Sequence, residues 1–351
     1  MTSNNRMSRR TVLAGCVATG GGILLTYRYS ALAQVGTPVA PASSLGWSDA
    51  FDSGNGLINV ATTVAPISSI CRNILGTHGN LHGIIPDGTN SHTFEPAPSD
   101  AVILSKADVI FVNGLQLEQP TMDLANANLK DGGEIDILGE QTITPDQYIY
   151  DFSFPKDAAK PNPHLWMNPI FAVNYAMLVN AKLSERVPDS TGYFQENLTR
   201  YSELLNRLDA GIAAAIQTIP QKNRKLLTYH DSYAYFAQRY GMTVIGAVQP
   251  SDFSEPSAKE VAALIDQIKQ EAVPAVFGSE VFPSTVLEQI AKEAGAVYFD
   301  KLRDDEPPGD PNASNHTYVG MMLSNMNLMI PALGGNVDAL SGIQPWDTYL
   351  P

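Results

Sequence analysis

Three of the six histidines lie in contexts that favour metal binding. His92 follows a Pro-Asp-Gly turn, His164 lies in the proline-braced segment 162–169, and His230 directly follows a strand predicted at residues 225–229. Strand ends and proline-fixed loops are the places where an α/β fold gathers a binding site. Neutral imidazole is a common ligand of transition metals. We therefore predict that these three side chains meet at the rim of a cleft as metal ligands.

A fourth, acidic ligand is expected from the second half of the chain. Asp300 follows the strand predicted at residues 296–299, which gives it the same kind of position as His230. Asp304 and Asp305 lie just beyond it and are the alternatives. Two ligands would then come from each half of the chain, which predicts a metal site between the halves. No local metal motif such as C-x-x-C or H-E-x-x-H is present, so this assignment rests on position alone.

The elements that would position these residues are those of an α/β protein. Short apolar or β-branched runs, each bounded by Gly, Pro or polar residues, alternate with helical patterns. This alternation predicts parallel sheets covered by helices, in two lobes. Such sheets collect their ligands beyond the carboxyl ends of the strands. The predicted strands are residues 57–62, 109–113, 134–138, 225–229, 243–248, 275–279 and 296–299.

Two helices have clear sequence signatures. Ser257 and Glu260 form a capping box that begins a helix over residues 257–272. A longer amphipathic pattern, which Pro220 ends, predicts a helix of about 39 Å. We interpret residues 191–220 as a rigid helix that joins the two lobes, and an ordinary helix inside one lobe is the alternative. A rigid connection predicts a small closing motion rather than a wide hinge.

The N-terminus has the parts of an export signal. Arg9 and Arg10 precede a Gly-interrupted apolar stretch, and an Ala-Leu-Ala sequence ends at Ala33. This pattern predicts cleavage after Ala33, export by a twin-arginine type of signal, and an extracytoplasmic mature protein. A lipid anchor at Cys16 and an uncleaved membrane anchor are the alternatives.

The domain organisation follows from these elements. A segment rich in Pro, Ser, Gly and Ala follows the signal and predicts a flexible tether. The predicted parts are the export signal at 1–33, the tether at 34–55, an N-terminal metal-binding lobe at 56–190, the connecting helix at 191–220, a C-terminal metal-binding lobe at 221–340 and a C-terminal tail at 341–351.

The composition excludes several classes of protein. With 44% hydrophobic and 17% charged residues, the 351-residue chain is too apolar for a disordered polymer, and two cysteines cannot form a disulfide scaffold. The net charge is -14, and loss of residues 1–33, which hold four arginines and no acid, leaves 18 basic against 36 acidic residues, or -18. Such a charge repels nucleic acid and mildly favours cations. We therefore expect no nucleic-acid partner.

Five stretches of the sequence carry a family resemblance. They are residues 91–100 (SHTFEPAPSD), 107–118 (ADVIFVNGLQLE), 162–169 (NPHLWMNP), 230–236 (HDSYAYF) and 255–259 (EPSAK). With them, the chain from about residue 57 to residue 333 resembles the metal-binding solute-binding proteins of ABC importers, the cluster A-I group that takes up zinc and manganese.

This resemblance implies a function as well as a fold. It implies two α/β lobes joined by one long helix, with a single divalent ion bound in the cleft by His92, His164, His230 and Asp300. It further implies a non-enzymatic carrier that delivers the ion to an ABC permease and ATPase complex in the cytoplasmic membrane. We expect such a carrier to be a monomer.

The donor set favours zinc over manganese. Three neutral imidazoles and one carboxylate suit a tetrahedral Zn²⁺, and in the resembling family the manganese binders more often carry a carboxylate where His230 stands. Mn²⁺ is the alternative ion. The sequence departs from the family pattern where Ser91 and Asn162 replace the usual aspartates that precede the first two histidines. These changes predict that the groups surrounding the ligands differ from those of the resembling family.

Two other classes of protein are alternatives. A secreted zinc hydrolase would use His92, His164 and His230 as a three-ligand site with Glu280 as the base. An organic-solute-binding protein would need converging aromatic and polar groups without the histidines. For a metal carrier, affinity is expected to fall below about pH 6, because protons compete for imidazoles whose ordinary pKa is roughly 6.5.

Overall fold

The computed structural model describes residue 51 and residues 54–151, 153–248, 256–279 and 284–351. The predicted export signal, Cys16, most of the predicted tether and Glu280 lie outside these residues. Within the described part of the chain, none of the helices is both long and apolar enough for a membrane span.

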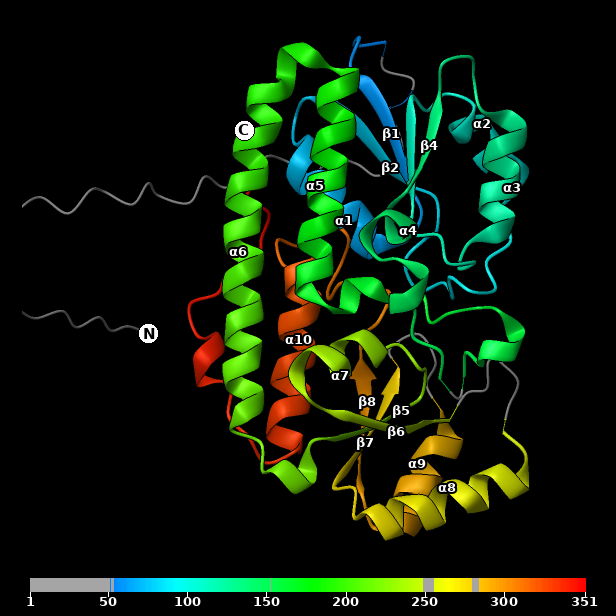
Figure 1. The fold of residues 1–351 in the computed structure, drawn as a ribbon, viewed down its shortest axis with the longest axis vertical. Coiled ribbons are helices and arrows are strands. Elements are labelled where there is room, and N and C mark those ends of the chain that lie inside the picture. The colour runs from blue at the N-terminus through cyan, green and yellow to red at the C-terminus, as the bar shows by residue number, and fades with distance from the viewer. Residues whose placement is uncertain (1–50, 52–53, 152, 249–255, 280–283) are drawn as a thin grey trace, which may run out of the picture. The chain divides into compact units, whose positions relative to one another are not determined.

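Two four-stranded parallel sheets form the two lobes (Figure 1). The first sheet has the order β2-β1-β3-β4 and contains β1 (Ile58–Thr62), β2 (Gly79–Gly83), β3 (Val109–Val112) and β4 (Glu134–Ile137). The second sheet has the order β6-β5-β7-β8 and contains β5 (Lys225–Thr228), β6 (Thr243–Ala247), β7 (Ala275–Ser279) and β8 (Val297–Leu302). All paired strands are parallel. The predicted α/β fold class with two parallel-sheet lobes is therefore confirmed.

Helices cover both faces of the sheets. The α-helices other than α6 are α1 (Ala65–Leu75), α2 (Pro98–Leu104), α3 (Gln119–Asn128), α4 (Leu138–Thr142), α5 (Pro169–Arg186), α7 (Ala234–Tyr240), α8 (Ala258–Glu271), α9 (Thr285–Ala294) and α10 (Tyr318–Ala332). Short 3₁₀ helices are Pro145–Gln147, Lys156–Ala158, Leu165–Met167, Pro188–Ser190, Gln221–Asn223 and Asp338–Leu340. The predicted capping box is present at the start of α8.

Successive side chains of a strand point to opposite faces of the sheet and pack in different apolar clusters. In β3, Val109 and Phe111 pack in the main core, whereas Ile110 and Val112 pack with α2 and α3. In the second sheet, Phe277 belongs to the same main core as Val109. Because one buried apolar cluster contains residues of both sheets, the two lobes share a core. This sharing favours the small closing motion that the sequence predicts.

The long helix α6 (Thr191–Gln217) lies where the sequence predicts the connecting helix. It lies beside α5 along one part of its length and beside α10 along another (Figure 1). Its buried face includes Leu205, Leu208 and Ile212, which belong to the shared core. The helix ends shortly before Pro220, whose ring removes a backbone donor. The two lobes are thus attached to one continuous helical element.

One strand is not predicted from the sequence, and another is longer than predicted. β2 is not predicted, because its sequence Gly-Asn-Leu-His-Gly lacks the apolar and β-branched residues that mark strands. A side chain at Gly79 would collide with Leu75 of α1, so the strand uses glycine to approach that helix. β8 extends to Leu302, three residues beyond the predicted end at Phe299. Its extension changes which acidic residue lies at the end of the strand.

Candidate metal centre

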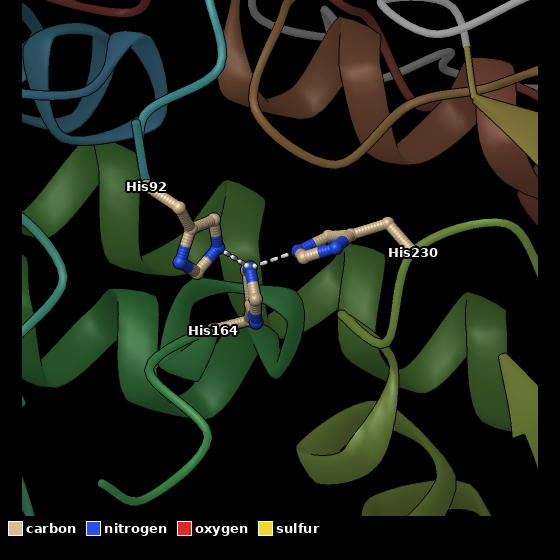
Figure 2. Close-up of side chains that lie close together, drawn as sticks. All are labelled: His92, His164 and His230. Carbon is tan, nitrogen blue, oxygen red and sulfur yellow. Dashed lines mark hydrogen bonds between the residues drawn. The ribbon is translucent and has the colours of Figure 1, made fainter. Parts of the chain in front are cut away.

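The three histidines singled out by the sequence converge on one point (Figure 2). The Nε2 atom of His164 lies 3.1 Å from Nε2 of His92 and 3.0 Å from Nε2 of His230. Their candidate ligand atoms all lie within 4.8 Å of one another. The prediction that these distant residues lie close together agrees with this geometry, and their role as metal ligands stays a prediction.

Each histidine comes from a segment that follows the carboxyl end of a strand. His92 lies in the loop after β2, where its backbone N–H donates to the Asn90 side chain. His164 lies between α4 and α5, directly before the 3₁₀ helix Leu165–Met167, and the side chain of Asn168 then caps α5. His230 lies two residues after β5, and the Thr228 hydroxyl donates to its carbonyl oxygen. The rule that parallel sheets gather ligands at their carboxyl ends therefore holds here.

The spacing of the three nitrogens suits a transition metal. In a tetrahedral site with metal–nitrogen distances of about 2.0–2.1 Å, neighbouring nitrogens lie about 3.3–3.4 Å apart. The two shortest distances between imidazole nitrogens, 3.0 and 3.1 Å, are slightly smaller. A separation of the rings by about 0.3 Å would therefore admit an ion at their centre.

Burial keeps the imidazoles in their neutral form. Burial lowers the pKa of His92 and of His164 well below the usual range, and the neighbouring imidazoles add to both shifts. Burial lowers the pKa of His230 to about 4, against the opposing effect of Asp305 and Asp151. Neutral imidazoles present lone pairs to a metal. From the sequence, we expect protons to compete with the metal for these rings below about pH 6. Because burial lowers the pKa values of the rings, this competition should begin at a lower pH.

The structure does not bring Asp300 to the three histidines. Asp300 is exposed within β8 rather than at its end, because the strand continues to Leu302. Asp305, one of the two alternatives, is partly buried beside the site, and its charge acts on His230. Its Oδ2 atom accepts a hydrogen bond of 2.5 Å from the Ser91 hydroxyl. Of the acidic residues that the sequence offers, Asp305 thus lies near the imidazoles and Asp300 does not.

The two aspartates after β8 are both difficult to ionise. Burial raises the pKa of Asp304 to about 6. Burial and the charge of Asp304 together raise the pKa of Asp305 to about 7, although the hydrogen bond from Ser91 and the nearby His230 act in the opposite direction. A bound cation would offset this unfavourable burial of negative charge. The electrostatics of the acidic side of the site therefore favour a positive ligand.

Two aromatic residues close the site, and the sequence analysis did not select either of them. The ring of Phe154 lies 5.9 Å from the ring of His92 and 6.0 Å from that of His164. The indole N–H of Trp166 donates a hydrogen bond of 2.8 Å to the carbonyl oxygen of Asp304. Trp166 stands two residues after His164 in the NPHLW stretch, which was a usable signal. Phe154 lies in a segment without a recognisable pattern.

The remaining histidines do not join this group. Their contacts are with other side chains: His78 stacks on Tyr193, the ring of His82 lies near Phe51, and His316 lies 3.3 Å from Asp87. Among the described residues, the group of potential ligands close enough to hold an ion consists of His92, His164 and His230. The base of the alternative hydrolase, Glu280, lies outside the described residues.

Known proteins match nearly the whole folded part of the chain. A family model for the periplasmic zinc-uptake complex component A, ZnuA, matches residues 60–332. The zinc-binding protein TroA of Treponema pallidum is 28% identical over 300 residues, which cover 83% of this chain and 92% of TroA. The manganese-binding lipoprotein MntA of Halalkalibacterium halodurans is 26% identical over 287 residues, which cover 80% of this chain and 90% of MntA.

Solved structures agree with the arrangement of the lobes. The periplasmic zinc-binding protein TroA from Treponema pallidum matches with a TM-score of 0.72 at 28% identity, over 79% of this chain and 99% of that chain. A Mn-bound periplasmic metal-binding protein from Candidatus Liberibacter asiaticus matches with a TM-score of 0.69 at 23% identity, over 78% of this chain and 98% of the other. The second likeness concerns the fold alone.

Proposed function

Because the chain belongs to the ZnuA family of periplasmic metal-binding components of ABC importers, we propose that it captures Zn²⁺ outside the cytoplasm and delivers it to a permease. The observation that carries this proposal is the convergence of three neutral imidazoles from both halves of the chain, two of them buried and one partly exposed. Neutral imidazole nitrogens that meet at one point can give their lone pairs to a shared cation. The family consists of binding components, which agrees with a function other than catalysis.

The ligands that we propose are His92, His164, His230 and Asp305. Asp305 replaces Asp300 in this set because it is partly buried and its charge acts on His230, whereas Asp300 is exposed. One carboxylate oxygen of Asp305 accepts from Ser91, and the other, Oδ1, is buried without a hydrogen-bond partner in the described part of the chain. A carboxylate oxygen there would complete a four-coordinate shell.

Zinc is favoured by the chemistry of the donors. Three nitrogen ligands and one oxygen ligand suit Zn²⁺, and Zn²⁺ binds more tightly than Mn²⁺ at nearly any site of this type. Among the relatives, TroA is named for zinc and MntA for manganese. Manganese transport by the same site is therefore the alternative, and it would require a geometry that disfavours tetrahedral coordination.

The capture step follows from the exposure of the three rings. His92 is partly exposed, whereas His164 and His230 are buried, so an incoming ion would reach His92 first. Binding the other ligands would then join the two lobes through the ion. The shared core and α6 favour a small closing motion. Release would require the permease to separate the ligands of one lobe from those of the other.

The cellular setting of this function is an extracytoplasmic one. Relatives such as MntA are named lipoproteins, which is compatible either with a lipid anchor at Cys16 or with the predicted cleavage after Ala33. The partners that we propose are the permease and ATPase of an ABC importer. The carrier itself would act as a monomer.

Metal retention by the exported chain tests this function. Purified residues 34–351 are loaded with Zn²⁺, dialysed and measured by elemental analysis, with Mn²⁺ as a competitor. We expect one zinc per chain, little manganese, and loss of zinc in His92→Ala, His164→Ala and His230→Ala. His78→Ala, which alters a histidine outside the cluster, is the matched control and should retain zinc. No stoichiometric metal in the parent protein, or full retention in the three variants, would contradict the proposal.

A further inference from the structure

Asn162 occupies the space between the two lobes directly behind the candidate metal ligands. Its side chain is fully buried, with 0% exposure. The oxygen Oδ1 lies 2.8 Å from Nδ1 of His164 and accepts the backbone N–H of the same residue at 3.1 Å. The nitrogen Nδ2 donates to the carbonyl oxygen of Asp231 at 2.8 Å and to Oδ2 of Asp151 at 3.0 Å. The Asn162 amide thus contacts the imidazole of His164 and the backbone of Asp231, the residue next to His230.

The partners of this amide determine its orientation. A backbone carbonyl oxygen only accepts hydrogen bonds, so the group that faces Asp231 must be the NH₂. The amide oxygen therefore faces His164, and Nδ1 of that ring must carry the hydrogen that it donates to Asn162. This tautomer leaves Nε2 of His164 without a hydrogen, so that its lone pair is directed at the point where the three rings meet. Asn162 thereby prepares His164 for a metal.

We propose that Asn162 is a positioning residue that couples the metal-binding state of His164 to the placement of His230 in the other lobe. The inference rests on the proposed metal-binding function. The acceptor end of the amide fixes the tautomer and ring orientation of His164. The donor end holds the backbone of Asp231, and thus of the adjacent His230, against the first lobe. The ion is retained because both contacts are made by one rigid, planar group.

An aspartate at this position would perform only the first of these two tasks. Its carboxylate would accept the Nδ1 hydrogen of His164 at least as well, because a charged acceptor strengthens such a bond. It has no hydrogen to donate to the carbonyl of Asp231, and it would face the carboxylate of Asp151. Asn162→Asp therefore separates the orientation of the imidazole from the contact between the lobes.

The test compares metal release in variants of the full exported chain, with Zn²⁺ as the probe. Asn162→Asp should lower zinc affinity by about 10- to 100-fold, the range for groups that hold metal ligands in place, and mainly as faster release. Nitrogen-15 NMR of the histidine rings should show the same His164 tautomer in Asn162→Asp as in the parent. Asn162→Ala should lose both the tautomer and the slow release.

A double variant distinguishes the lost contact from charge repulsion. Asn162→Asp combined with Asp151→Asn removes the repulsion and lets position 151 donate to position 162, but it leaves the carbonyl of Asp231 without its donor. We expect release as fast as in Asn162→Asp. Release at the parent rate in this double variant, or in Asn162→Asp itself, would overturn the proposal.

The matched control is Asn168→Asp in the same loop. The side chain of Asn168 caps α5, a role that aspartate performs equally well, so zinc release should equal that of the parent. If the parent protein retains no zinc, the proposed function fails. If the parent retains zinc and the Asn162 variants release it at the parent rate, only the coupling role fails.

Discussion

The two lobes share one strand order but hold their candidate ligands in different ways. In the first lobe, His92 and His164 lie on loops, 9 and 27 residues beyond the ends of β2 and β4, and the paired strands keep an uninterrupted register. In the second lobe, His230 and Asp305 lie two and three residues beyond β5 and β8, and the pairings of these strands contain register shifts. In the first lobe, contacts made by the loops thus position the candidate ligands. In the second lobe, the strands themselves position the candidate ligands that directly follow them.

This difference shows where a small change in the backbone alters the site. A register shift lies between Phe277 and Ser279, where β7 pairs with β8. A shift of one residue turns every following side chain to the other face of a strand. The position of the acidic ligand that we propose therefore depends on the register of β8, whereas the position of His164 depends on contacts such as that with Asn162.

The strongest test of this comparison exchanges the two acidic candidates of the second lobe. Zinc bound by four protein ligands is stabilised by about 10–16 kcal/mol, so one ligand corresponds to about 3–4 kcal/mol, or about 100- to 1000-fold in affinity. Asp305→Ala should weaken zinc binding by this amount, and Asp300→Ala should leave it unchanged because that side chain is exposed. Competition titration against a chelator measures both. Weaker binding in Asp300→Ala alone would restore the assignment made from sequence.

The difference between the two lobes also explains which parts of the fold and of the candidate site can be predicted from the sequence. Both sheets and the three histidines were predictable, because apolar runs end at recognisable polar or proline-containing segments. β2 is not predicted because Gly79, which permits the close approach of the strand to α1, is a residue of low strand propensity. The sequence favours Asp300 over Asp305 because it does not reveal the length of β8, which depends on pairing with β7 and is a long-range property. The bridging contact of Asn162 likewise requires Asp231, which is distant in the sequence.

A second difference between the lobes concerns buried charge. In the first lobe, Glu118 is buried and accepts hydrogen bonds from the Thr63 hydroxyl and from the backbone N–H groups of Asn113 and Gly114. Burial nevertheless raises its pKa to about 7, above the ordinary 4.5. In the second lobe, the guanidinium of Arg239 in α7 instead pairs with Asp209 of the connecting helix α6, at 2.9 and 2.6 Å.

Glu118 should therefore make the stability of the protein depend on pH. The folded state holds the proton more tightly than the unfolded state, so the contribution of Glu118 is complete below pH 4.5 and is lost as the pH rises through 7. Relative to Glu118→Gln, the parent should lose about 3 kcal/mol of unfolding free energy over this interval. Urea unfolding of the metal-free proteins at several pH values measures the difference. A difference that is constant across this interval would contradict the pKa shift.

The ion pair of the second lobe should have the smallest effect. The Arg239 side chain is 41% exposed, so solvent screens its attraction to Asp209. Asp209→Asn keeps an acceptor for the Tyr240 hydroxyl and should lower the unfolding free energy by about 1 kcal/mol or less. Since salt screens such pairs, the loss should shrink at high ionic strength.

Glu196→Gln provides the matched control on the same helix. It removes the exposed pair of Glu196 with Arg200 and should produce no measurable change. If Asp209→Asn instead destabilises the protein as much as the titration of Glu118, and does so independently of salt, the pair is effectively buried. The Asp209–Arg239 pair, which joins the second lobe to α6, would then contribute as much to the free energy of unfolding as Glu118 does in the first lobe. The closing motion would in that case have to arise within the loops that carry His92 and His164, rather than between the lobes.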